Sequence, residues 1–318
     1  MPDNLPPDIP VIVIGGPTAS GKSGLAITLA RHFNGCIINA DSIQLYQDLP
    51  TLTARPAVSD TDHIPHRLYG FLSADEKTDA ACWRDWAARE IHSAYANGLL
   101  PIVVGGTGFY IAALLQGFSP IPAVPDDIRT RITRLCDEQG IEKFYAETLD
   151  LDPKILGRID PHNPRRVMRA REVYETTGIS LIDWQAQPKS GPPQGMRFFT
   201  MTVLPDRDAL YDKCNKRFEM MLDHGAIDEV RDLKARINNG EISSTPPVTR
   251  ALGYTEIRDM LAGDLSRDAA MDKATQITRN YAKRQSTWFR NQLTADLVLD
   301  NAQDSAHACE KITHWRAR

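Results

Sequence analysis

The stretch "IPVIVIGGPTASGKSGLA" at residues 9–26 constrains the fold of this chain more than any other part of it. Its uninterrupted apolar run, followed by glycines, is typical of a strand buried on both faces of a parallel sheet. The next residues match G-x-x-x-x-G-K-[ST], in which backbone N–H groups and the start of a helix surround an anion. The candidate phosphate loop is therefore Gly16, Pro17, Thr18, Ala19, Ser20, Gly21, Lys22 and Ser23. The pattern predicts that Lys22 binds terminal phosphate oxygens and that the Ser23 hydroxyl is a ligand of Mg²⁺.

Alternation of apolar and helical segments indicates the fold class. Four further apolar segments predict strands, at residues 35–41, 101–106, 197–204 and 296–300. Helical patterns follow most of them, at residues 23–32, 79–96, 109–116 and 208–222. We therefore expect an α/β fold with a parallel sheet flanked by helices, like the core of P-loop NTPases. In the third helix, Phe109, Tyr110 and Ile111 are expected in the core.

Proline and glycine clusters divide the chain. The segment between "SPIPAVPDD" and "QPKSGPPQG" is helical in pattern, and clusters of this kind are typical of domain boundaries. We predict a first part of the core at residues 1–119, a helical insertion at 120–195, and a second part of the core at 196–318.

Bulk properties favour a cytoplasmic protein. Five scattered cysteines show no metal-ligand spacing, and residues 1–10 carry no signal-peptide pattern. Residues 91–125 carry no formal charge, but prolines and glycines interrupt them, so we expect no membrane span. We also expect a monomer. The net charge of −4 does not favour a nucleic-acid binder unless basic residues are concentrated locally.

Polar side chains follow two of the predicted strands. Asp41 and Ser42 come after one, and Thr107 lies in the glycine turn after the next. Because ligands of doubly wound sheets bind at the carboxyl ends of the strands, these residues and the phosphate loop are expected at one site. Asp41 can be a Mg²⁺ ligand, a general base or a helix cap, and Thr107 can be a cap as well.

Two basic runs are candidates for nucleic-acid binding. Residues 154–171 contain six basic side chains and one acid, Asp160, and "NPRRVMRAREVY" predicts a helix capped by Asn163. Residues 277–295 contain no acid, and Trp288 and Phe289 are available there for packing or base stacking. Each run can equally be a solvated helix face.

Several motifs together resemble a known family. "GPTASGKS", "NADSIQLYQDL", "TARP", "PHRLYGF", "VVGGTGFYIAALL" and "TRNYAKRQSTWFR" occur in this order between residues 16 and 290, as in the bacterial tRNA dimethylallyltransferases. The departures are small: Ser23, Arg55 and Asn280 stand where threonine, lysine and glutamine are common.

The resemblance implies a reaction and a set of site residues. The dimethylallyl group of dimethylallyl diphosphate would pass to N6 of the adenosine 3′ of the anticodon (position 37) in tRNAs that read codons beginning with U. Asp41 would be the general base, Thr107 a catalytic residue, and Arg217 a ligand of the diphosphate, although by sequence alone Arg217 reads as a surface residue. Residues matching the tRNA-binding positions (for the anticodon stem-loop) are Asp41, Ser42, Ile43, Gln44, Thr107, Arg129, Arg165, Arg166, Val167, Met168, Arg169, Arg279, Lys283 and Arg284.

Three other functions use parts of the same pattern. A small-molecule kinase would need Lys22 and Asp41 but not the Thr107 turn or the basic insertion. A non-catalytic RNA-binding ATPase would retain tRNA without modifying it. A prenyltransferase acting on free adenine nucleotides would not need an insertion of about 75 residues with its arginines.

Overall fold

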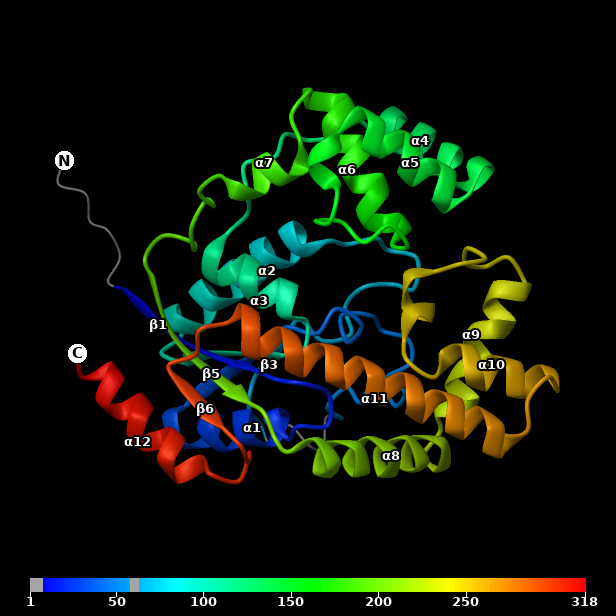
Figure 1. Cartoon of the computed structure of the whole chain (residues 1–318). Coiled ribbons are helices and arrows are strands. Elements are labelled where there is room, and N and C mark those ends of the chain that lie inside the picture. Colours follow the sequence, from blue (N-terminus) through cyan, green and yellow to red (C-terminus); the bar gives the residue numbers. More distant parts are fainter. Residues whose placement is uncertain (1–7, 58–62) are drawn as a thin grey trace. The chain divides into compact units, whose positions relative to one another are not determined.

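A computed structural model describes residues 8–57 and 63–318 (Figure 1). Residues 1–7, where we expected no signal peptide, lie outside the described residues. The chain forms two compact units: a core unit (Met1–Leu115 and Pro193–Arg318) and a helical unit (residues 116–192). The sequence predicted the insertion at residues 120–195.

The core unit is built on a six-stranded sheet in the order β3-β2-β4-β1-β5-β6. All of its strand pairs are parallel, as the apolar runs predict. The strands are β1 (Ile9–Gly15), β2 (Gly35–Asn39), β3 (His66–Arg67), β4 (Leu100–Gly105), β5 (Met196–Val203) and β6 (Leu297–Leu299). On one side of β1 lie β4, β2 and β3, and on the other lie β5 and β6, so the glycine loop at residues 16–23 follows a central strand of the sheet.

Helices connect the strands and cover both faces of the sheet. Those of the core unit are α1 (Lys22–Phe33), α2 (Ala80–Ala96), α3 (Gly108–Gln116), α8 (Arg207–Asp223), α9 (Ala226–Asn238), α10 (Tyr254–Ala262), α11 (Arg267–Gln292) and α12 (Ser305–Arg316). In Figure 1, α2 and α3 lie above the strands, and α1 and α12 lie below them. The α/β fold with a helix-flanked parallel sheet is thereby confirmed.

Alternation along β1 separates two apolar layers. Ile12 and Ile14 pack with α1 and α12, where Leu29 and Ile312 are fully buried. Side chains of this size contribute about 2 kcal/mol each when they are fully buried. Gly15 faces the opposite side, where a Cβ atom would lie 2.4 Å from the ring of Phe289 in α11. The sheet and α11 therefore meet across a glycine, which brings α11 close to the loop that follows β1.

The helical unit has a small core of its own. It consists of α4 (Asp126–Gln139), α5 (Ile141–Leu151), α6 (Pro164–Thr177) and α7 (Leu181–Ala186). Asn163 caps α6 by accepting a hydrogen bond from the Arg166 amide, and Pro164 is its first residue, as predicted. Phe144 and Val167 are fully buried between the helices.

The apolar residues at the start of α3 are only partly in the core. Tyr110 and Ile111 are buried, as expected, but the side chain of Phe109 is 64% exposed, so its assignment to the core is wrong. Phe109 lies in the first turn of α3 and is not among the buried residues of that helix. No helix in the described part of the chain is both long and apolar enough to cross a membrane.

Candidate active site

The glycine loop (residues 16–23) leads directly from β1 into α1. Gly21 has a φ of 90° and precedes the first turn of α1, a left-handed conformation that suits glycine. A Cβ atom on Gly16 would lie 2.6 Å from the carbonyl oxygen of Val203, so no larger residue fits there. Lys22 Nζ donates to the carbonyl oxygen of Pro17 across the loop, at 3.1 Å. The loop is thus a closed turn with the amine of Lys22 bent back over it.

Arg217 reaches this loop from α8. Its Nη2 donates to Thr18 Oγ1 at 2.5 Å, across 199 residues of sequence. The guanidinium is partly buried rather than spread on the helix surface. The structure therefore brings Arg217 to the place that the resemblance implied, although a surface position was the simpler interpretation of the sequence.

Asp41 is held immediately after β2 by its neighbours. The Asn39 side chain, fully buried, accepts a hydrogen bond from the Asp41 amide at 2.8 Å and donates to the carbonyls of Asp41 and Leu68. Asp41 Oδ1 in turn accepts from the amide of Ile43 at 3.2 Å. The Asn39 side chain thereby fixes the backbone of Asp41, and the Ile43 amide holds its carboxylate.

Thr107 joins the end of β4 to the loop after β2. Its Oγ1 accepts a hydrogen bond from the Ser42 amide at 3.0 Å, and its own amide donates to the carbonyl of Ala40 at 3.1 Å. A Cβ atom on Gly105 would lie 2.1 Å from that same carbonyl oxygen, so glycine is required for this approach. Hydrogen bonds consequently join Thr107 to the residues on either side of Asp41, at the carboxyl ends of β2 and β4.

Electrostatics connect these residues to the glycine loop. Burial lowers the pKa of Lys22 from its ordinary 10.5 to about 8; Asp41 opposes this shift and Arg217 adds to it. Burial likewise lowers the pKa of Arg217, and Asp41 again opposes the change. The three charged groups therefore act on one another at a single site, with two cations and one carboxylate. The site therefore has an excess of positive charge, which favours the binding of an anion.

Two phenols stand close to this carboxylate. Burial raises the pKa values of Tyr69 and Tyr281 above the ordinary range, and the charge of Asp41 raises them further. Both side chains are therefore neutral at physiological pH. The charge of Asp41, which is itself partly exposed, therefore acts on two neutral phenols.

The sequence analysis missed one residue of this site, Gln285 in α11. Its side chain is buried and connects the two glycine-rich turns: Oε1 accepts from the Thr18 amide and Nε2 donates to the Gly106 carbonyl, both at 2.8 Å. In the same helix, the Trp288 ring would lie 2.3 Å from a Cβ atom on Gly108. In sequence, the motif "AKRQSTWFR" indicates a basic surface by its charges, and its glutamine has no visible role.

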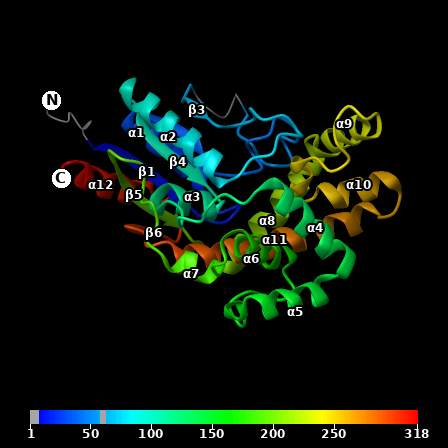
Figure 2. The same ribbon diagram turned by 90° about the horizontal axis from the view of Figure 1, so that it is seen from above.

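The RNA-binding candidates of the core unit lie in two places. Ser42, Ile43 and Gln44 belong to the loop after β2, where Gln44 Nε2 donates to the carbonyls of Thr53 and Ala54. The basic candidates lie along α11, which packs beside α8 (Figure 2).

On α11 the basic side chains have different surroundings. Arg279 is partly buried and donates to Gln276, whereas Arg284 is exposed and stacks over the ring of Tyr281. Lys283 lines a hollow of about 170 Å³ together with Pro205, Arg207, Leu210, Tyr211, Ser286, Thr287 and Arg290. Three cations and no acid line this hollow, which gives α11 a positive surface.

In the helical unit, the basic run is divided between surface and interior. Arg165 and Arg166 are exposed at the start of α6, Arg169 pairs with Glu172 at 3.3 Å, and Met168 packs against the core of the unit. Val167 is 0% exposed in that core, so its side chain offers no surface to a ligand, and the predicted tRNA contact of this residue would have to involve its backbone.

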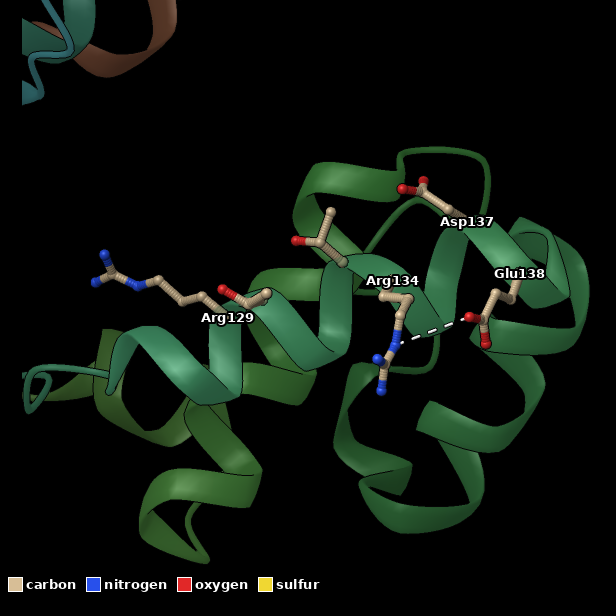
Figure 3. A pocket seen from close by; sticks show the side chains of 6 residues that line it. Arg129, Arg134, Asp137 and Glu138 are labelled. Atoms are coloured by element: carbon tan, nitrogen blue, oxygen red, sulfur yellow. Dashed lines mark ion pairs between the residues drawn. The ribbon is translucent and has the colours of Figure 1, made fainter.

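Arg129 lies on α4 beside a larger hollow of about 560 Å³. Figure 3 shows that all of the side chains lining this hollow project from that one helix, with Arg134 and Glu138 paired at 3.8 Å. Arg129 extends away from the others and approaches Asp126 at 3.6 Å. No catalytic residue is among them, so this hollow is not the candidate active site.

The described residues contain no group of three or more His, Cys, Asp or Glu side chains that could hold a metal. A Mg²⁺ ion at a glycine loop does not need such a group, because it is held mainly by substrate phosphates, water and one hydroxyl. The Ser23 side chain is exposed at the start of α1 and suits that limited role.

Comparisons with known proteins agree with this geometry. The chain matches the family model described as IPP transferase over residues 44–292, and that described as isopentenyl transferase over residues 9–72. It is 46% identical to the tRNA dimethylallyltransferase of Paramagnetospirillum magneticum, covering 91% of this chain and 90% of that protein. The corresponding enzyme of Rhodospirillum centenum is 45% identical, with 93% of each chain covered.

Solved structures show the same fold. A eukaryotic dimethylallyltransferase acting on tRNA has a TM-score of 0.78 and 26% identity, covering 92% of this chain and 74% of that one. The tRNA isopentenylpyrophosphate transferase of Bacillus halodurans has a TM-score of 0.66 and 29% identity, covering 96% and 98%. Because the IPP transferase model matches more than half of the chain, and the Paramagnetospirillum magneticum enzyme is 46% identical over nine-tenths of it, the chain belongs to the tRNA dimethylallyltransferase family.

Proposed function

We propose that the protein transfers the dimethylallyl group of dimethylallyl diphosphate to N6 of adenosine 37 of tRNA and releases diphosphate. One observation carries the proposal: the parallel sheet brings a glycine loop with two cations to the same edge as an oriented carboxylate and a threonine. The first group suits a diphosphate, and the second suits an amine that must lose a proton.

The leaving group is stabilised by the glycine loop. Breaking the allylic C–O bond places negative charge on the diphosphate oxygens, and preorganised N–H donors and cations lower the energy of that state. Lys22 and Arg217 supply the cations, and the buried Ser20 hydroxyl, without a partner among the described residues, is free to donate. Mg²⁺, when bound through Ser23, would add Lewis-acid stabilisation of the same oxygens.

The nucleophile is activated by Asp41. The exocyclic amine of adenine is weakly nucleophilic, because its lone pair is delocalised into the ring. A carboxylate within hydrogen-bond reach removes one proton as the C–N bond forms. Asn39 accepts a hydrogen bond from the backbone of Asp41, and Thr107 accepts one from the adjacent Ser42 amide. These contacts would present the carboxylate to the amine in one orientation.

The tRNA is bound by basic side chains of both units. Arg165, Arg166 and Arg129 are exposed cations of the helical unit, and Lys283 and Arg284 are exposed on α11. A flipped-out adenosine is the form in which N6 reaches a site at the ends of the strands. The phenols of Tyr69 and Tyr281, on which the charge of Asp41 acts, would help to exclude the water that competes for an allyl cation. We further propose that the enzyme is a cytoplasmic monomer.

The proposal is tested by incubating unmodified tRNA with the protein, Mg²⁺ and dimethylallyl diphosphate, followed by mass spectrometry of the nucleosides. The expected result is an adenosine that carries one five-carbon prenyl unit at position 37. Parallel reactions contain adenosine monophosphate as acceptor, or radiolabelled ATP as donor. Prenylated free nucleotide without prenylated tRNA, or phosphoryl transfer from ATP, would contradict the proposal.

A further inference from the structure

Gln285 bonds both glycine-rich turns of the site. Its Oε1 accepts from the backbone amide of Thr18 in the glycine loop, and its Nε2 donates to the carbonyl of Gly106, each at 2.8 Å. The two partners lie 267 and 179 residues away in sequence, so no local structure enforces either contact. The side chain is 6% exposed, and both polar ends of its amide are used.

Residue 18 of the loop is consequently held from two sides. Gln285 takes its backbone N–H, and Arg217 binds its side-chain hydroxyl at 2.5 Å. The Thr18 N–H is therefore directed to α11 rather than into the loop. Of the amides that follow residue 18, that of Ser20 donates to the Pro17 carbonyl at 3.3 Å, and those of the first turn of α1 have no helical partner and can face an anion.

The second contact of Gln285 lies next to the chemistry. Gly106 precedes Thr107, whose Oγ1 holds the Ser42 amide beside Asp41. A Cβ atom on Gly106 would lie 2.4 Å from Gln285 Nε2, so the glutamine occupies the space that a side chain there would need. One amide thus joins the loop that binds the leaving group to the turn that supports the base.

We propose that Gln285 is a positioning residue that sets the distance between the bound diphosphate and the Asp41–Thr107 pair. The inference rests on the proposed function and adds to it a residue that touches neither substrate. Displacements of about 1 Å between reacting groups can lower a rate by about a hundredfold. Loss of the Gln285 contacts would allow the glycine loop, and the diphosphate bound to it, to be displaced in this way.

The test is the variant Gln285→Met, which keeps the length of the side chain and removes both hydrogen bonds. We expect kcat/KM for dimethylallyl diphosphate to fall at least about tenfold, with the Kd for tRNA within about twofold of wild type. The matched control is Gln292→Met, the same exchange at an exposed position of α11, which should leave both kcat/KM and the Kd for tRNA unchanged. If Gln285→Met does not fold, Gln285→Glu replaces it, since an ionised carboxylate cannot donate to Gly106, and the same loss is expected.

A double variant separates positioning from simple structural support. Thr18→Val removes the hydroxyl that Arg217 binds and so loosens residue 18 from its other side. If Gln285 acts through residue 18, Gln285→Met should raise KM for the diphosphate less in the Thr18→Val protein than in wild type.

Three results would overturn the inference: full additivity of the two substitutions, an unchanged kcat/KM in a folded Gln285 variant, or a loss confined to tRNA affinity. Each of these results would be compatible with prenylation of tRNA by the wild-type protein, and so with the proposed function. An absence of prenylated tRNA with wild-type protein would instead contradict the proposed function.

Discussion

The depressed pKa of Lys22 predicts a loss of diphosphate use at alkaline pH. Only the protonated amine attracts the diphosphate oxygens. Because burial lowers the pKa from 10.5 to about 8, the cation is lost as the pH rises through 8, well below the range of an ordinary lysine. The kcat/KM for dimethylallyl diphosphate reports ionisations of the free enzyme and should therefore fall there.

The magnitude follows from the titration itself. At pH 9, about one Lys22 side chain in eleven keeps its proton, whereas about 97 in 100 would do so with an ordinary pKa. We expect kcat/KM to be about tenfold lower at pH 9 than at pH 7, and to fall about tenfold per further unit. The pH dependence of kcat should be weaker, because the charge of the bound diphosphate stabilises the ammonium.

The assay measures initial rates of tRNA prenylation between pH 6.5 and 9.5, with tRNA saturating. Arg217→Met provides an internal test, because Arg217 is one of the charges that lower the pKa of Lys22. In that variant the alkaline limb should move to higher pH, even though the rates themselves are reduced. A wild-type kcat/KM that stays level to pH 9.5 would refute the assignment of Lys22 as a buried cation of the diphosphate site.

Three further changes test other parts of the molecule. Ser23→Ala should raise the Mg²⁺ concentration for half-maximal activity about tenfold, because it removes one hydroxyl ligand; an unchanged requirement would exclude Ser23 as that ligand. Arg166→Ala should weaken tRNA binding and reduce the slope of log Kd against log salt by about 1, whereas an unchanged slope would mean that this arginine meets no phosphate. Val167→Ala should destabilise the protein by about 2 kcal/mol in denaturant unfolding, because it opens a cavity in the helical unit. If the free energy of unfolding of Val167→Ala equals that of the exposed control Arg165→Ala, the burial of Val167 is contradicted.

Local patterns predicted most of the core unit. The strands expected at residues 35–41, 101–106, 197–204 and 296–300 lie within two residues of β2, β4, β5 and β6. These strands can be predicted because burial of both faces makes them continuous apolar runs in the sequence. β3 was missed, since "HR" is short and polar, and it becomes a strand by pairing with the edge of β2.

The site was predictable only in part. A motif identifies the glycine loop, and the carboxyl ends of parallel strands place Asp41 and Thr107 beside it. Gln285 was missed because its two partners are backbone groups far away in sequence, and a backbone group leaves no trace in residue identity. The burial of Val167 was not predicted for another reason: its helix is basic in sequence, and only the packing of the helix shows which face is buried.

The central claim is that Asp41 accepts the proton of the adenosine amine at a site where Lys22 and Arg217 hold the diphosphate. It is tested most directly by Asp41→Ala, in which tRNA affinity and the single-turnover rate of prenylation are measured on the same preparation. We expect the Kd for tRNA to stay within about threefold of wild type, and the rate to fall by at least about a hundredfold. A rate close to that of wild type at unchanged affinity would contradict the claim and would leave the base unassigned.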